Sequence, residues 1–133
     1  MVGKAREITV ALENQRGRLA HVCTWLAQKK VNILAISVVD SATMGVVRLV
    51  VDKPAVALKM IKESYPLTVT EREVLLVELP NRPGVLAKTA DRLARKRINI
   101  EYVYGSTSGR GNATLVLAVA NAERARKALG GTY

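Results

Sequence analysis

The stretch "NRPGVLAKTADRLARKRINI", residues 81–100, decides the fold, because "NQRGRLAHVCTWLAQKKVNI", residues 14–33, precedes it with many of the same residues at the same spacing. The shared residues lie 67 positions apart without a gap. They include the pairs Asn14 and Asn81, Gly17 and Gly84, Leu19 and Leu86, Asn32 and Asn99, and Ile33 and Ile100. A match this regular indicates an internal duplication, with each copy taking about half of the chain.

The first copy is predicted to contain six elements in the order strand, helix, strand, strand, helix, strand. Alternating apolar residues indicate the half-buried first strand, and apolar spacing at i, i+3, i+4 and i+7 indicates the first helix, which ends near Lys30. Asp52 is predicted to cap the second helix, which has Pro54 in its first turn. The four strands are predicted at residues 7–12, 32–40, 46–52 and 67–71.

The second copy repeats this order but ends early. Its elements are predicted at residues 73–79, 85–97, 99–106 and 113–120, followed by a helix that Asn121 caps and that ends at Gly130. No sixth element follows, so an edge strand is left exposed or is covered by something else, such as a partner chain. Residues 67–79 contain no Gly, Asn or Pro, and can run as one long bent strand from the first copy into the second.

The predicted fold class is therefore α+β, with two ferredoxin-like βαββαβ units in tandem, the second lacking its last strand. The predicted domains are residues 1–72 and 73–133. A unit of about 60 residues buries only about 60% of the surface of its unfolded chain. We therefore expect the two units to share an interface.

The formal net charge of +10 raises the possibility of a nucleic-acid ligand. Several of the cations, however, fall at the ends of the two predicted helices, where they favour the negative end of the helix dipole: Lys29, Lys30, Arg95, Lys96 and Arg97. This placement favours a solvated basic surface over a nucleic-acid footprint. The single cysteine, Cys23, excludes an internal disulfide framework and a structural zinc cluster. No apolar run approaches about 18 residues, so we expect a cytoplasmic protein without membrane contact, metal or cofactor.

The loop before the helix of the second copy carries chemistry suited to a small anion. Gly84 has no Cβ and allows close approach, and the amides of Gly84, Val85 and Leu86 have no partners inside the helix. These amides lie at the positive end of the helix dipole, where a carboxylate binds. The side chain of Asn81 can accept from an ammonium group, and Pro83 stiffens the loop. The same residue types are also good turn and cap formers without any ligand, and that interpretation stays open.

These residues resemble the ACT domain, a small regulatory module of amino-acid metabolism. The family signature is an apolar strand, Asn-x-Pro-Gly-Val-Leu, an amphipathic helix and an Asn-Ile pair that opens the next strand. The second copy matches it throughout, at Asn81, Pro83, Gly84, Val85, Leu86, Asn99 and Ile100. The first copy departs from it, with Arg16 in place of the proline and Arg18 in place of the valine. Its loop is therefore expected to be looser or to hold a more acidic ligand.

The resemblance covers residues 6 to 130 and implies a stand-alone, non-catalytic tandem ACT protein that binds a small amino acid between two ACT domains. One wall would come from the Asn-x-x-Gly loop of one domain and the other wall from strand residues of its neighbour. The site residues implied are Asn14, Arg16, Gly17, Arg18, Leu19, Asn81, Arg82, Gly84, Val85 and Leu86 in the loops, and Asn32, Ile33, Asn99 and Ile100 on the strand side. A homodimer is expected. The ligand's side-chain end and the regulated protein are not predicted.

The same sequence raises three alternative functions. An enzyme is disfavoured because His21, the only histidine, lies one turn before Trp25 where packing explains it, and Cys23 falls on the apolar stripe with the core. An RNA-binding domain shares this order of elements, and Tyr102 and Tyr104 could stack on bases, but residues 113–120 contain no aromatic residue. A regulatory subunit that acts on an amino-acid-metabolism enzyme or a transcription regulator is compatible with the sensor, with the open edge of the second copy as its docking surface.

Overall fold

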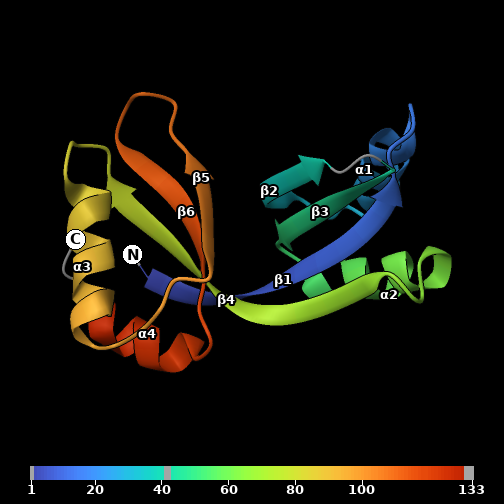
Figure 1. The fold of residues 1–133 in the computed structure, drawn as a ribbon. Helices are drawn as coiled ribbons and strands as arrows, with labels where there is room; N and C mark the ends of the chain where they lie inside the picture. The colour runs from blue at the N-terminus through green and yellow to red at the C-terminus, as the bar shows by residue number, and fades with distance from the viewer. Residues whose placement is uncertain (1, 41–42, 131–133) are drawn as a thin grey trace. The chain divides into compact units, whose positions relative to one another are not determined.

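The computed structural model describes residues 2–40 and 43–130. Ten elements follow one another in these residues (Figure 1). In chain order they are β1 (Val2–Glu13), α1 (Arg18–Gln28), β2 (Ile33–Asp40), β3 (Met44–Val51), α2 (Pro54–Ser64), β4 (Val69–Pro80), α3 (Val85–Arg95), β5 (Tyr102–Ser106), β6 (Asn112–Ala118) and α4 (Ala122–Leu129). The predicted α+β fold with two ferredoxin-like units is confirmed, and β4 is the single long strand that the sequence indicated.

The chain forms two compact units. The first unit comprises Arg6–Arg72, and the second comprises Glu73–Tyr133 together with Met1–Ala5. Strands β1 and β4 each contribute to both units, so the strand order is β2-β3-β1-β4 in the first unit and β5-β6-β4-β1 in the second. The first five residues thus group with the opposite half of the chain from the one to which the duplication assigns them.

The first unit has its own apolar core. Strands β1 and β3 pair antiparallel, as do β2 and β3, and their inward side chains meet α1 and α2. Each helix places two buried residues on the sheet: Val22 and Leu26 from α1, and Ala57 and Ile61 from α2. They pack with Ile8, Val10, Leu12, Val31, Val47, Leu49, Val51 and Val69.

The second unit repeats this packing with β4, β6 and β5. The buried cluster joins Leu93 of α3 and Ala125 and Leu129 of α4 to strand residues such as Leu75, Val77 and Leu117, and Val2 packs against it. Residues 2–5 occupy the place beside β4 where a fourth strand of this unit belongs. The edge that the sequence left exposed or assigned to a partner chain is therefore covered by the chain's own N-terminal segment.

An ion pair joins this N-terminal segment to α4. Lys4 Nζ lies 3.0 Å from a carboxylate oxygen of Glu123, which also receives two hydrogen bonds from Arg126, at 2.7 and 3.1 Å. These two cations, Arg126 first and Lys4 second, lower the pKa of the Glu123 carboxyl to about 2. Because both side chains of the Lys4–Glu123 pair are about two-fifths exposed, solvent screens the attraction.

The structure corrects two predictions about the helices. The buried face is narrower than the apolar spacing suggested, because only the i and i+4 ridge lies over the sheet: Leu19 of α1 and Leu86 of α3 are 38% and 45% exposed, and Cys23 is only half-buried. Asp52 does not cap α2. Its carboxylate accepts the backbone N–H of Asn32 at 2.9 Å instead, which ties the start of β2 to the end of β3. Asn121 does cap α4, as predicted, by accepting from the Arg124 amide at 3.0 Å.

Candidate ligand site

The two predicted loops end in the same helix-start geometry. Gly17 precedes α1 with φ of 86°, and Gly84 precedes α3 with φ of 87°. Both angles lie in the left-handed region, which glycine adopts without the Cβ clash that strains other residues. No side-chain hydrogen bond caps either helix among the residues that the structure describes.

The backbone N–H of the first helical residue after each loop is nevertheless hydrogen-bonded. The N–H of Val85 donates to the Arg82 carbonyl, and that of Arg18 to the Gln15 carbonyl, both at 3.3 Å. The sequence-based expectation of a bare Val85 amide is therefore wrong. The amides of the following residues, Leu86 among them, have no acceptor within the first helical turn and stay available to an anion.

A hollow of about 210 Å³ opens beside the helix start of the second unit. It combines an apolar floor with polar groups at its rim, as binding sites for small molecules do. The polar part comes from Asn81 and Arg82 on the loop and from Ser106 and Thr107 at the end of β5. The rest of the lining is Leu79, Pro80, Val85, Leu86, Gly105, Ala113 and Leu115.

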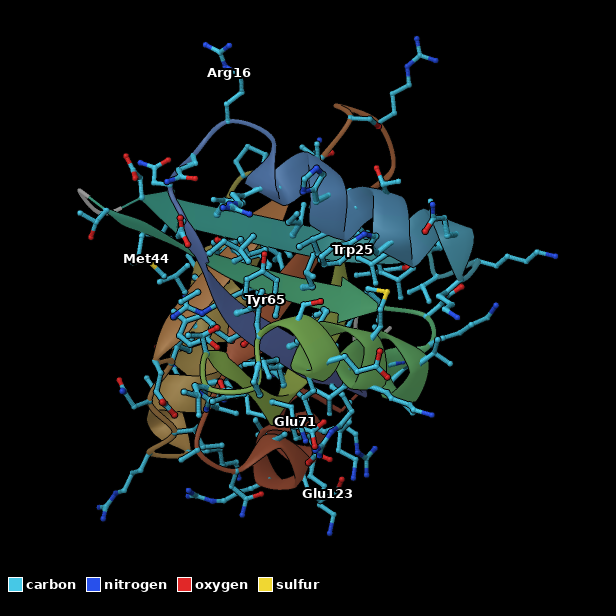
Figure 2. All side chains as sticks on the ribbon, turned by 90° about the vertical axis from the view of Figure 1, so that its right-hand side faces the viewer. Arg16, Trp25, Met44, Tyr65, Glu71 and Glu123 are labelled. Atoms are coloured by element: carbon cyan, nitrogen blue, oxygen red, sulfur yellow. The ribbon has the colours of Figure 1, made fainter. Side chains whose placement is uncertain are left out.

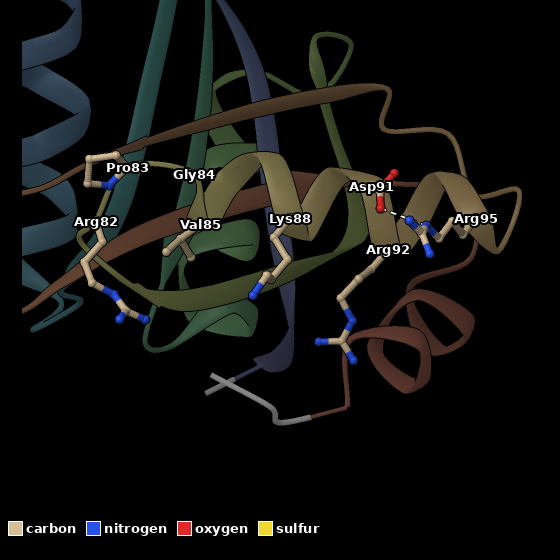
Figure 3. A pocket seen from close by; sticks show the side chains of 8 residues that line it. All are labelled: Arg82, Pro83, Gly84, Val85, Lys88, Asp91, Arg92 and Arg95. Atoms are coloured by element: carbon tan, nitrogen blue, oxygen red, sulfur yellow. Dashed lines mark ion pairs between the residues drawn. The ribbon is translucent and has the colours of Figure 1, made fainter.

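A larger, open hollow of about 870 Å³ lies along the outer side of α3 (Figure 3). Its lining includes Arg82, Lys88 and Arg92, whose side chains point to the same side of the helix. Asp91 and Arg95 also line it and form an ion pair of 2.8 Å. The positive charge beside the helix start favours anions over cations in this region.

The residues predicted for the first loop lie together but are differently engaged. Arg16 is exposed at the tip of the loop, and its side chain extends away from the unit (Figure 2). Arg18 lies near Glu13, at 3.6 Å, and donates to the Gln15 side chain at 3.3 Å. The Asn14 side chain donates to the Asp40 carboxylate at 2.7 Å.

The predicted strand-side residues lie away from the loop of their own copy. Asn99 and Ile100 follow the C-terminal end of α3, whereas Gly84 lies at its N-terminal end. An 11-residue helix is about 16 Å long, so the two groups do not share a hollow within one unit. Asn99 lines a separate hollow with Asn121 and Arg124. Asn32 is exposed and Ile33 packs against the first core, and both precede or open β2, beyond the end of α1.

Gly105, Ser106, Thr107 and Asp40 were not identified from the sequence as site residues. The duplication carries the signal that could have found them, because Asp40 and Thr107 are 67 positions apart, as are Val38 and Gly105. The two residues of each of these pairs differ in type, whereas the Asn and Gly residues of the two loops are identical.

The residues weighed for other functions have packing contacts. The rings of His21 and Trp25 stack with centroids 6.2 Å apart, and those of Tyr102 and Tyr104 stack at 6.5 Å. Within residues 2–40 and 43–130, no group of three or more His, Cys, Asp or Glu side chains is arranged to hold a metal ion. No helix in the same residues is long and apolar enough to cross a membrane.

The fold and its two Asn-x-x-Gly loops define a pair of ferredoxin-like regulatory domains. A family model described as an ACT domain pair matches residues 4–130, and the chain belongs to this family.

Solved structures share the fold. A protein of Bacteroides thetaiotaomicron, BT0572, is 30% identical with a TM-score of 0.86 over 96% of this chain and 88% of that one. The regulatory subunit of aspartate kinase from Thermus thermophilus is 19% identical, with a TM-score of 0.70 over 97% of this chain and 95% of that one. The corresponding subunit from Thermus flavus is 20% identical, with a TM-score of 0.67 over 97% and 93%. A comparison with curated proteins gave no match.

Proposed function

We propose that this ACT domain pair is a non-catalytic sensor. It binds a small amino acid at the start of a helix that follows an Asn-x-x-Gly loop, and it relays the presence of this ligand to a partner protein. One observation carries the proposal: the left-handed Gly84 leaves the start of α3 without a side-chain cap, beside a hollow with a polar rim and an apolar floor. The open amides match a carboxylate, and the Asn81 side chain matches an ammonium group.

Binding energy requires more than this loop. A micromolar ligand needs about 8 kcal/mol. A hydrogen bond to a charged group contributes about 1.5–3 kcal/mol, so two amides fall short even before the ordering costs of binding are counted. A second wall is therefore part of the proposal. The strand-side residues of another ACT unit, Asn32 and Ile33 or Asn99 and Ile100, are proposed to supply it.

We place this second wall in a homodimer. Strands β2 and β5 are the outermost strands of their units. Strand β2 presents large apolar side chains that are between 42% and 53% exposed: Leu34, Ile36, Val38 and Val39. An exposed apolar edge strand is prone to pair with another chain, and pairing across it would bury these side chains. If ligand and dimer share one surface, the ligand stabilises the dimer, which is the coupling that a sensor needs.

A thermal-shift screen of the twenty amino acids tests this function, because a ligand that binds only the native state raises its melting temperature. We expect one or a few amino acids to raise the melting temperature, and Asn81→Ala to abolish the rise. Leu67→Ala is the matched control, since Leu67 is 96% exposed and lies outside the hollow. If none of the twenty moves the melting temperature of the unmodified protein, the sensor proposal is wrong.

A partner enzyme is the second part of the proposal. The likeness to regulatory subunits of aspartate kinase favours a separate enzyme of amino-acid metabolism over a nucleic-acid target. The chain would act as a regulatory subunit that is itself without activity. Purified protein mixed with a candidate kinase should change the kinase's sensitivity to the amino acid found in the screen. Retention on DNA or RNA with a steep dependence on salt, without any effect on the enzyme, would favour the nucleic-acid alternative instead.

A further inference from the structure

The two copies can be compared position by position because their loops share one backbone geometry. The N–H of Asn14 donates to the Thr43 carbonyl at 3.0 Å, and the N–H of Asn81 donates to the Gly111 carbonyl at the same distance. The glycines before the two helices have nearly equal φ angles, 86° and 87°. Differences between the loops therefore lie in the side chains.

The polar side chains of the first loop, apart from Arg16, have partners within the first unit. Asn14 donates to Asp40 at 2.7 Å, which withdraws its amide group from any ligand. Arg18, at the start of α1, lies near Glu13 and donates to the Gln15 side chain. The Asp40 carboxylate would also repel the carboxylate of an incoming amino acid.

The second loop lacks every one of these pairs. Thr107 stands at the position of Asp40, Val85 at that of Arg18, and Pro80 at that of Glu13. The Asn81 side chain makes no hydrogen bond to the residues that the structure describes, although it lines the same hollow as Thr107. The side-chain amide and carbonyl groups of Asn81 are therefore available to a ligand.

A second difference between the copies lies in the lining of the hollow. Val38 of β2 corresponds to Gly105 of β5, and both face the helix side of their sheets, since Val38 pairs with Val47 and Gly105 with Leu115. Gly105 lines the hollow without adding a side chain to it. In the first unit, the isopropyl group of Val38 stands at this position and is 50% exposed.

The lining indicates the class of ligand. A volume of about 210 Å³ corresponds to roughly seven water molecules at about 30 Å³ each, which is room for a small amino acid. The lining contains Arg82, the hydroxyls of Ser106 and Thr107 and several apolar side chains, but no carboxylate to match a basic ligand side chain.

We propose that only the second unit binds the amino acid, that the ligand has a small side chain without a positive charge, and that Thr107, at the position of Asp40, decides which copy binds. The first loop is self-paired and serves as scaffold. This inference rests on the proposed function and adds to it the choice of loop and the ligand class.

Isothermal titration calorimetry of the full chain, with the amino acids that pass the thermal-shift screen, tests the inference. The expected stoichiometry is one ligand per chain. Thr107→Asp and Asn81→Ala should each weaken binding at least tenfold, whereas Asp40→Thr and Asn14→Ala, at the matching positions of the first loop, should leave the affinity and the stoichiometry unchanged. Thr107→Ser is the conservative control and should retain binding. Because Thr107, Asp40, Asn14 and Asn81 are all exposed, the variants are expected to fold, and a thermal melt checks this.

Each alternative result has a distinct meaning. Two ligands per chain, loss of binding in Asn14→Ala, or full affinity in Thr107→Asp would overturn the choice of loop while leaving the sensor function intact. Tight binding of lysine or arginine alone would overturn the ligand class. Absence of binding by every amino acid to the unmodified protein would overturn the sensor function and, with it, this inference.

Discussion

Gly105 offers the sharpest test of how the hollow is built, through the substitution Gly105→Ala. A Cβ at this position would lie 2.4 Å from the Thr114 carbonyl oxygen and 2.4 Å from Cδ2 of Leu115. Ordinary van der Waals contacts of a Cβ begin at 3.4 Å, so the strand or its neighbour must move by about an ångström. Because one of the two atoms belongs to the backbone, a side-chain rotation alone does not relieve the contact.

The cost can be bounded from this geometry. Overpacking in a well-packed region costs about 1–3 kcal/mol, and the reduced entropy of the unfolded chain returns about 0.4–1 kcal/mol when glycine becomes alanine. The net loss is therefore between about 0 and 2.6 kcal/mol. For a chain of this size, that corresponds to a melting temperature lower by up to about 10 °C.

Gly3→Ala is the matched control, because Gly3 lies in β1 and has no atom within 4 Å of the added Cβ. Without a clash, only the entropy gain remains, and this variant should melt at or slightly above the temperature of the unmodified protein. Circular dichroism melts of the three proteins at equal concentration measure the difference. If Gly105→Ala melts as high as Gly3→Ala, the close approach of β5 and β6 at this residue is not as described, and the hollow does not depend on it.

Three further predictions concern the supports of the two units. Asn121→Ala should lower the free energy of unfolding by about 1 kcal/mol in urea titrations, because it removes a 3.0 Å capping bond, whereas Lys59→Ala, at an exposed position of α2, should change it by less than about 0.5 kcal/mol. Glu123 has a pKa lowered from 4.5 to about 2, so its carboxylate stabilises the fold above pH 4.5 and loses this effect as the pH falls to 2; Glu123→Gln should be less stable than the unmodified protein at pH 6 and equal to it at pH 2. Asp52→Ala should speed hydrogen exchange of the Asn32 amide about fivefold, as loss of a hydrogen bond worth about 1 kcal/mol requires, while Asp52→Asn should not; faster exchange in the first turn of α2 instead would show that Asp52 caps that helix.

Local features of the fold were predictable because short-range chemistry fixes them. The asparagine that caps α4 and the left-handed glycine that precedes each main helix act within three or four residues of their own position. The duplication repeated the glycine signal, since Gly17 and Gly84 are 67 positions apart. The long strand β4 was also predictable, since residues 69–79 contain no Gly, Asn or Pro.

Pairings between distant residues were not predictable from these patterns. Asp52 precedes α2, so its carboxylate could accept from the first amides of this helix. It accepts instead from the Asn32 amide, 20 residues away in the sequence. The Asn14–Asp40 bond joins residues 26 positions apart. Asp40 and Asp52 are both of a residue type that is common in turns. Only the fold shows which donor hydrogen-bonds to each carboxylate.

The segment that covers the edge of the second copy was not predictable for the same reason. The first strand was predicted only at residues 7–12, and nothing in the composition of residues 2–5 specifies which half they complete. The choice depends on the antiparallel run of β1 along β4, which passes from one unit into the other. The Lys4–Glu123 ion pair and the packing of Val2 both depend on this course of β1, so neither can be predicted from the sequence patterns alone.

That crossing has a consequence for how the protein is made. During synthesis, residues 2–5 leave the ribosome about 70 residues ahead of the strand they must pair with, so the second half completes its sheet only after the chain closes a long loop. Closing such a loop costs entropy that grows slowly with its length, but pairing between distant segments slows folding. A fragment that begins at residue 73 would lack the strand that residues 2–5 supply, so the second unit is expected to be incomplete without the start of the first.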